Sequence, residues 1–189
     1  MKSRMIIRKL TLAFLFLSLN NAGSLAEKLN YDKEVSLPRE IFNFHVVAPN
    51  IMRGSQPSKK DLKALKEQCG VRTVLDLRFD PKEIKWEKKI VEKLGMNFIS
   101  VPMNWNEEQG AEKIEKCLSV MSDWSKQPVF IHCYAGKDRT GLICAAYRIK
   151  YDHWSFEDAL FEMHVYGYSR DCCFKLEESL STWNKQRQK

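Results

Sequence analysis

The fold is organised around the stretch VFIHCYAGKDRTG, which spans residues 129–141. Its first three residues are β-branched or aromatic, which predicts a buried strand. His132 and Cys133 then enter a short loop that ends at Arg139, and a helical pattern begins at Thr140. A loop between a strand and a helix presents backbone N–H groups and the positive end of the helix dipole to an anion. The stretch therefore predicts a phosphate-binding site.

The residue types in this loop suit phosphate chemistry. Gly136 permits a turn of the backbone that a Cβ atom would obstruct. Arg139 offers a bidentate guanidinium to two phosphate oxygens. The same positive field lowers the pKa of the Cys133 thiol, which provides a thiolate nucleophile near neutral pH. A buried cysteine near a salt-bridged arginine is the alternative, but His, Cys, Gly, Arg and Thr together favour a catalytic loop.

Residues 1–26 have the features of a signal peptide. A basic start is followed by a short, mostly apolar run at 10–19, and Ser24-Leu25-Ala26 supplies small residues before a cleavage site. The apolar run is shorter than the roughly 20 residues of a membrane span, although an uncleaved anchor is the alternative. We expect an exported protein, periplasmic or secreted, with residues 27–189 as a single domain and no membrane span after cleavage.

The charge of the chain is mildly basic. The full sequence has 31 Lys and Arg against 24 Asp and Glu. Removal of residues 1–26 takes away four basic residues and no acidic one, which leaves 27 against 24. This excess is too small to indicate nucleic-acid binding. The basic residues near the loop, Lys137, Arg139 and Arg148, favour an anionic substrate instead.

The cysteines and histidines do not form a recognisable metal or disulfide pattern. With Cys133 as nucleophile, five of the six cysteines remain, so at least one is free or pairs between chains. Cys117 and Cys144 lie in helical apolar patterns and are expected in the core. The pairing of Cys172 and Cys173 stays open. The four histidines are scattered without zinc-site spacing, and we expect no metal and no cofactor.

Strand and helix patterns alternate along the chain. Strands are expected at 42–47, 51–55, 71–77, 97–101 and 129–131, the first two as a hairpin and 71–77 as a central strand. Helices are expected from Ser58 to Gly70 and at 84–94, 111–125, 140–150, 155–164 and 172–185, with Trp124 on the apolar stripe of the third. The alternation predicts an α/β fold with a central, mostly parallel sheet of four to five strands flanked by helices. Cys133 lies at a strand's carboxyl end, where ligands bind in such sheets.

The motif His132-Cys133-x-x-Gly136-x-x-Arg139-Thr140 resembles the signature of cysteine-based protein tyrosine and dual-specificity phosphatases. The segments IMRGSQP at 51–57 and GVRTVLDLR at 70–78 resemble the opening of small atypical dual-specificity phosphatases, including exported bacterial ones. AGKDRT at 135–140 is also similar to the loop of bacterial tyrosine phosphatases with additional phosphoinositide activity. The resemblance covers nearly all of residues 27–189 and implies a dual-specificity phosphatase-like fold.

The resemblance also implies a mechanism. Cys133 attacks the phosphorus in line and forms a phosphocysteine intermediate. Thr140 then stabilises the thiolate as a leaving group, and His132 either sets the thiol pKa or is only structural. The phosphate oxygens are bound by Arg139 and by the backbone amides of Tyr134, Ala135, Gly136, Lys137, Asp138 and Arg139. The Lys137 side chain is a second candidate contact or an ordinary exposed lysine.

The general acid departs from the family pattern. Family members usually carry an aspartate in the loop that corresponds to PMNWNEEQG at 102–110, and this loop has none. We favour Asp138 as the proton donor, with Glu107 or Glu108 as the alternatives. A fourth possibility is that good leaving groups need no acid at all.

The alternative role for Asp138 is that of a partner of one of two arginines, Arg53 or Arg78. Those arginines, together with Asp76, are interpreted as ion-paired scaffold near the carboxyl ends of strands. Trp105 is a candidate wall of the substrate site.

The resemblance implies a phosphatase that hydrolyses phosphate esters, but it leaves the substrate open. Phosphotyrosine, phosphoserine, phosphothreonine, phosphoinositides and inositol phosphates all fit the motif. A catalytically weak phosphate-binding module is the alternative from another class. The expected partners are therefore a phosphorylated protein or a phosphoinositide as substrate, and the chain is expected to be a monomer.

Overall fold

The computed structural model describes residues 41–188 of the chain. The predicted signal peptide at 1–26 lies outside the described residues. Within residues 41–188, none of the helices combines the length and the apolar composition of a membrane span.

A five-stranded sheet forms the centre of the domain, in the order β1-β2-β5-β3-β4. Its strands are β1 (His45–Ala48), β2 (Ile51–Gly54), β3 (Thr73–Asp76), β4 (Asn97–Ser100) and β5 (Val129–His132). Only the β1–β2 hairpin is antiparallel, and the other three pairings are parallel. The predicted α/β fold with a mostly parallel sheet is confirmed. The predicted central strand at 71–77 is β3, a fully buried interior strand that pairs with β5 and β4, and β5 is the middle strand of the five.

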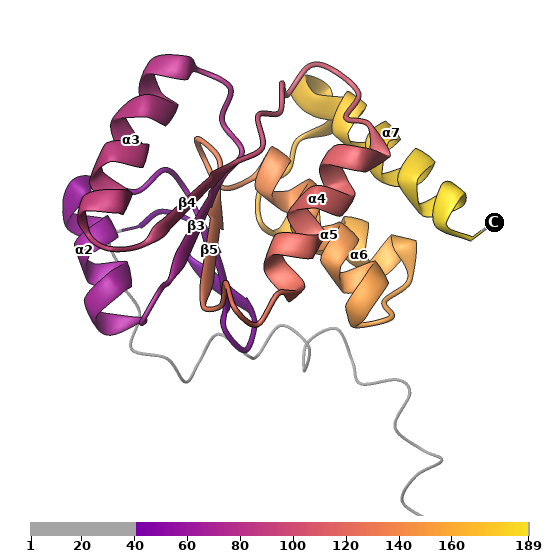
Figure 1. Ribbon diagram of the computed structural model, residues 1–189. Coiled ribbons are helices and arrows are strands. Elements are labelled where there is room, and N and C mark those ends of the chain that lie inside the picture. Colours follow the sequence, from indigo (N-terminus) through magenta and orange to yellow (C-terminus); the bar gives the residue numbers. More distant parts are fainter. Residues whose placement is uncertain (1–40, 189) are drawn as a thin grey trace, which may run out of the picture. The chain divides into compact units, whose positions relative to one another are not determined.

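Within residues 41–188, six helices cover the two faces of the sheet. They are α2 (Lys59–Gln68), α3 (Pro81–Lys93), α4 (Ala111–Ser122), α5 (Asp138–Tyr151), α6 (Phe156–Val165) and α7 (Arg170–Arg187). Figure 1 shows α2 and α3 on one face of the sheet and α4 to α7 on the other. This layering leaves the carboxyl ends of the parallel strands free to carry loops.

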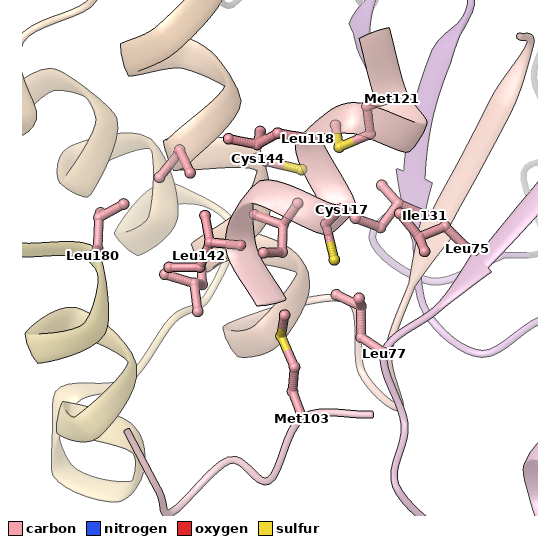
Figure 2. Packing of buried hydrophobic residues seen from close by; sticks show 14 of the residues in the cluster. Leu75, Leu77, Met103, Cys117, Leu118, Met121, Ile131, Leu142, Cys144 and Leu180 are labelled. Atoms are coloured by element: carbon pink, nitrogen blue, oxygen red, sulfur yellow. The ribbon is translucent and has the colours of Figure 1, made fainter. Parts of the chain in front are cut away.

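The alternation of side chains along β5 divides the core into two clusters. Val129 and Ile131 belong to the larger cluster, which α4, α5 and α7 complete, whereas Phe130 packs with α2 and α3. Figure 2 shows the larger cluster, in which Cys117 of α4 and Cys144 of α5 lie among aliphatic side chains. Both cysteines are fully buried, as predicted.

β1 differs from its predicted bounds, whereas the predicted start of α2 is confirmed. β1 begins at His45 rather than at 42, because Asn43 adopts a positive φ of 56° that breaks the strand. At Ser58 the predicted N-cap is confirmed: its hydroxyl accepts a hydrogen bond from the backbone N–H of Asp61, and its own N–H donates to the Asp61 carboxylate. This reciprocal pair is a capping box, which fixes the start of α2.

Three later helices also differ from prediction. α3 begins at Pro81, three residues early, because the Asp80 carboxylate accepts hydrogen bonds from the N–H groups of Lys82 and Glu83. α4 ends at Ser122, and the prediction that Trp124 faces the core is wrong, since its side chain is 80% exposed. α7 extends over 170–187 rather than 172–185.

Candidate active site

The loop that carries the predicted nucleophile connects β5 to α5. β5 is buried along its whole length between two parallel neighbours, so its carboxyl end holds Cys133 at a fixed place. α5 begins at Asp138, two residues before the predicted start at Thr140. Asp138 and Arg139 therefore belong to the first turn of the helix, whose N–H groups have no partner within the helix. These groups and the helix dipole face the loop.

The end of β2 supports this loop from behind. Gly136 has a φ of 69°, and a Cβ atom at this position would lie 2.5 Å from the backbone carbonyl of Gly54. The Gly136 carbonyl accepts hydrogen bonds from the Arg53 guanidinium at 2.6 Å and from the Asn43 side-chain amide at 2.9 Å. The close approach and the positive φ both require glycine here. Arg53 thus supports the loop through a hydrogen bond to a backbone carbonyl, and the ion pair that the sequence suggested for it is not found among residues 41–188.

The Cys133 side chain is buried and favours the thiolate. Burial by itself raises the pKa of the thiol, but the Arg139 charge, the Thr140 hydroxyl and the N–H groups of Thr140 and Gly136 lower it more. The net effect is a pKa below the ordinary value of a cysteine. The buried Thr140 hydroxyl has no oxygen or nitrogen partner in the described part of the chain, so it is available to the sulfur. The thiolate is therefore prepared for nucleophilic attack.

Cys133 and Arg139 share a cavity of about 450 Å³. Three partly exposed aromatic residues, Phe79, Trp105 and Tyr134, also line it. The Arg139 guanidinium lies 5.8 Å from the centre of the Phe79 ring and donates a hydrogen bond of 3.4 Å to the Met103 carbonyl. The expected position of Trp105 beside the substrate site agrees with this lining.

The cavity also contains the preferred candidate for the general acid. Asp138 lines it, and burial raises the pKa of this carboxyl above its ordinary value. One carboxylate oxygen accepts a hydrogen bond of 3.4 Å from the Ser169 N–H. A carboxyl group with a raised pKa keeps its proton at higher pH and can donate it to a leaving group.

The contacts support neither the alternative role of Asp138 as an arginine partner nor the alternative proton donors. Neither proposed arginine pairs with it, because Arg53 donates to Gly136 and Arg78 pairs with other carboxylates. Glu107 and Glu108 are exposed and do not line the cavity. The structure therefore brings Asp138 to the nucleophile and leaves the two glutamates outside.

Two further acidic residues line the cavity and were not predicted. Asp80 uses one carboxylate oxygen to cap α3, and Glu83 lies 3.6 Å from the Arg78 guanidinium. Asp80 could have been found in the sequence, because Asp before Pro is a common start of a helix. The cavity wall is thus more acidic than the loop sequence alone indicates.

A buried ion cluster fixes His132 under the loop. Nε2 of His132 lies 2.8 Å from the Glu87 carboxylate, and Nδ1 lies 3.0 Å from the Cys133 carbonyl oxygen. Arg78 contacts Glu87 and holds Asp76 through two hydrogen bonds of 3.0 and 2.9 Å. Burial lowers the pKa of His132, but the carboxylates of Glu87 and Asp76 raise it more. His132 therefore positions the Cys133 backbone instead of contacting the thiol.

The same cluster is a poor metal site. Ligand atoms of Asp76, Glu87 and His132 lie within 4.8 Å of one another. Arg78 already supplies positive charge to both carboxylates, so a cation would have to displace a guanidinium. Glu87 was not predicted, because a glutamate on a charged helix gives no sign that it is buried. Asp76 and Arg78 are ion-paired scaffold, as the sequence suggested.

The remaining predicted residues lie at the edge of the site. Tyr134 and Ala135 line the cavity, whereas Lys137 does not, and its ammonium lies 5.5 Å from the centre of the Phe42 ring. Cys172 and Cys173 form a disulfide between sequence neighbours, and both line the cavity. Their pairing was left open by the sequence.

Comparison with known proteins agrees with this geometry. The model of the family described as DSP-PTPase phosphatase fused to NAD+ Kinase matches residues 43–172. Dual specificity protein phosphatase TpbA of Pseudomonas aeruginosa is 26% identical over 126 residues, which are 67% of this chain and 55% of that protein. Inositol diphosphatase SIW14 of Saccharomyces cerevisiae is 32% identical over 129 residues, which are 66% of this chain and 44% of that protein. The chain thus spans about half the length of these curated relatives.

Solved structures show the same fold. The core catalytic domain of SIW14 in complex with citrate aligns with a TM-score of 0.66 at 23% identity, covering 81% of this chain and 90% of that one. TpbA in complex with pTyr aligns with a TM-score of 0.62 at 24% identity, covering 74% and 83%. The predicted dual-specificity phosphatase-like fold is confirmed.

Proposed function

Because the chain belongs to the family of DSP-PTPase phosphatases fused to NAD+ kinase, we propose that it is a cysteine-dependent phosphomonoesterase of the dual-specificity type. One observation carries the proposal. The Cys133 thiol, with its lowered pKa, lines one cavity with Arg139 at the start of α5. A thiolate and an arginine at a helix N-terminus suit nucleophilic attack on a phosphate ester.

The geometry supports a reaction in two steps. In the first step the Cys133 sulfur attacks phosphorus, an S–P bond forms, and the P–O bond to the leaving group breaks. Arg139 and the backbone N–H groups of the loop bind the oxygens on which charge accumulates. In the second step water attacks the phosphocysteine, inorganic phosphate leaves, and the thiolate is restored. The Thr140 hydroxyl stabilises the sulfur as this charge returns.

Asp138 supplies the proton in this scheme. Its protonated carboxyl donates to the leaving-group oxygen in the first step, and its carboxylate accepts a proton from water in the second. The raised pKa and the position of Asp138 in the cavity support both roles.

We propose phosphotyrosine as the substrate group. The rings of Phe79, Trp105 and Tyr134 line the cavity and can stack on a phenyl ring. The charges in the cavity favour a single phosphate. Asp80, Glu83 and Asp138 line it, while Arg78 is already paired, which leaves Arg139 as the lining cation for the substrate.

Inositol phosphates are the second candidate class. The 32% identity to inositol diphosphatase SIW14 favours them, as does the similarity of the Lys-Asp-Arg loop to phosphatases with phosphoinositide activity. The carboxylates of Asp80 and Glu83 in the lining oppose them, because a ligand with several phosphates would be repelled. We therefore expect such substrates to be turned over more slowly than a phosphotyrosine peptide.

A substrate panel on the purified protein tests these proposals. The panel contains a generic aryl phosphate, a phosphotyrosine peptide, a phosphoserine peptide and an inositol polyphosphate. Cys133→Ser is expected to abolish turnover of every member while still binding phosphate, because the hydroxyl is a far weaker nucleophile. Metal-independent turnover that survives in Cys133→Ser would refute the mechanism. Phosphate binding by a wild type that turns over nothing would indicate the weak binding module instead.

We further propose that the chain is exported and cleaved after Ala26. The basic start, the apolar run and the small residues before the cleavage site support this proposal. Expression of the full chain in a bacterium and intact-mass measurement of the periplasmic fraction test it. A product that retains residues 1–26 in the cytoplasm would contradict it.

A further inference from the structure

A basic groove lies between α2 and α3, outside the lining of the active-site cavity. Its volume is about 880 Å³, and its lining consists of five lysines and three apolar residues. No acidic side chain lines it. The lining thus combines positive charge with apolar surface, of which Ile90 and Leu94 are also partly buried against the core.

The apolar floor of the groove is a regular stripe on α3. Trp86, Ile90 and Leu94 follow one another at intervals of four residues and therefore lie on one side of the helix. Trp86 remains 48% exposed, although an indole is among the largest apolar side chains. The stripe faces the groove and offers an anchor for apolar side chains of a partner.

The walls of the groove are basic on both sides. α2 contributes Lys59, Lys60 and Lys63, and α3 contributes Lys89 and Lys93. In the described part of the chain Lys63 pairs with Glu67 through exposed side chains at 3.8 Å, a contact that solvent screens. Lys59, Lys89 and Lys93 have no acidic partner among residues 41–188. At Lys59, Lys89 and Lys93 the groove thus carries positive charge that no acidic side chain of residues 41–188 neutralises.

A third hollow shares lining residues with both the groove and the active-site cavity. Trp86 also lines a neighbouring hollow of about 500 Å³, whose far side is formed by Tyr134 and Ala135. Tyr134 and Ala135 in turn line the catalytic cavity with Cys133. A single bound chain can therefore run from the nucleophile past Trp86 into the groove.

We propose that this groove binds an acidic, amphipathic segment of a phosphoprotein substrate. Acidic side chains of the segment pair with the lysines of both walls, and its apolar side chains pack on Trp86, Ile90 and Leu94. The apolar floor is unsuited to a ligand made only of phosphates, and the concave shape is unsuited to a flat lipid surface. That the bound segment belongs to a phosphoprotein substrate rests on the proposed phosphatase function. Binding of an acidic, amphipathic segment in the groove does not require catalysis.

A binding experiment with a matched pair of variants tests the groove. The probe is a fluorescein-labelled synthetic peptide with glutamates around leucine and phenylalanine at intervals of three and four residues. Lys89→Ala/Lys93→Ala removes two lysines of the wall, and Lys82→Ala/Lys85→Ala removes two exposed lysines of the same helix that do not line the groove. We expect the first pair to raise Kd about five-fold and the second less than about two-fold.

Trp86→Ala tests the apolar floor separately. We expect it to raise Kd about ten-fold, because a large aromatic anchor is lost. Circular dichroism establishes that each variant is folded. Equal Kd values for the wall and control pairs would overturn the proposal. The proposal would also be overturned if a peptide with the same glutamates and no apolar residues bound as tightly as the amphipathic probe.

An activity measurement links the groove to the substrate. Lys89→Ala/Lys93→Ala is expected to lower kcat/KM about five-fold for a phosphotyrosine peptide that carries the acidic segment, and to leave an aryl phosphate unaffected. Absence of aryl phosphate turnover in the wild type would defeat the proposed function and leave the binding result intact. Lysine-dependent binding to phosphatidylglycerol vesicles without peptide binding would show a membrane contact and overturn the proposal.

Discussion

Glu87 provides the sharpest test of how the fold supports the catalytic loop. The substitution Glu87→Gln keeps the shape of the side chain and removes one charge from a fully buried cluster. The carboxylate contacts both His132 and Arg78, so the neutral amide weakens two ion pairs at once. Arg78 keeps its two hydrogen bonds to Asp76, which compensate in part.

The expected loss of stability follows from these contacts. Breaking a buried ion pair costs about 3–5 kcal/mol, and the remaining Asp76 partner places Glu87→Gln near the lower end. For a domain of this size each kcal/mol shifts the melting temperature by about 2–4 °C. Glu87→Gln should therefore melt about 6–12 °C below the wild type. Glu92→Gln, on the same helix but exposed and paired with Lys88, should melt within about 2 °C of it.

The size of the shift should depend on pH. The pKa of His132 in the folded state is raised above 6.5. Its contribution is therefore fully present below the unfolded pKa and is lost as pH rises through the folded pKa. The gap in melting temperature between wild type and Glu87→Gln should narrow above neutral pH, without vanishing, since Arg78 stays charged. Thermal unfolding followed by circular dichroism at several pH values measures this gap. A Glu87→Gln variant as stable as Glu92→Gln would refute the reasoning.

Three further predictions concern the loop itself. Asp138→Asn should slow hydrolysis of an alkyl phosphate about 10²–10⁴-fold and hardly affect an aryl phosphate with a good leaving group. In the wild type, kcat/KM for the alkyl ester should fall as pH rises through the raised pKa of Asp138, and this fall should be absent in Asp138→Asn. If the substitution slowed both esters equally, Asp138 would be excluded as the general acid. Near pH 6, iodoacetamide should alkylate Cys133, whose pKa is lowered, before Cys117 or Cys144. Burial raises the pKa of Cys117 to about 12 and that of Cys144 to about 11. Mass mapping that finds Cys117 or Cys144 modified first would contradict this prediction. Gly136→Ala should lower kcat/KM about 10²-fold through displacement of the loop, and retention of wild-type activity would show that the contact with Gly54 is not critical.

The sequence predicted the parts of this site that are local. Cys133, Arg139 and Thr140 stand at fixed spacing between a strand and a helix, and that spacing is itself the phosphate-binding device. The same holds for the Ser58 cap, which depends on a residue three positions away. Such features need no knowledge of tertiary structure, because all their partners lie within eight consecutive residues of the chain.

The contacts that lay beyond prediction join distant parts of the chain. Glu87 meets His132 only because α3 packs beside the carboxyl end of β5, and nothing within α3 distinguishes it from the exposed Glu92. Arg53 likewise reaches Gly136 across 83 positions of the sequence. These pairings depend on the order of the strands, which a hydrophobic pattern does not encode.

The position of Asp138 shows how a small error in an element changes a functional argument. With a helix that begins at Thr140, Asp138 would lie in the loop with an undetermined direction. With α5 beginning at Asp138, the carboxyl belongs to the first turn and lines the cavity beside Arg139. An acidic side chain at a helix N-terminus ordinarily loses its proton more readily, because the dipole favours the charged form. Here burial dominates and raises the pKa of Asp138, which is the direction of shift that a general acid needs.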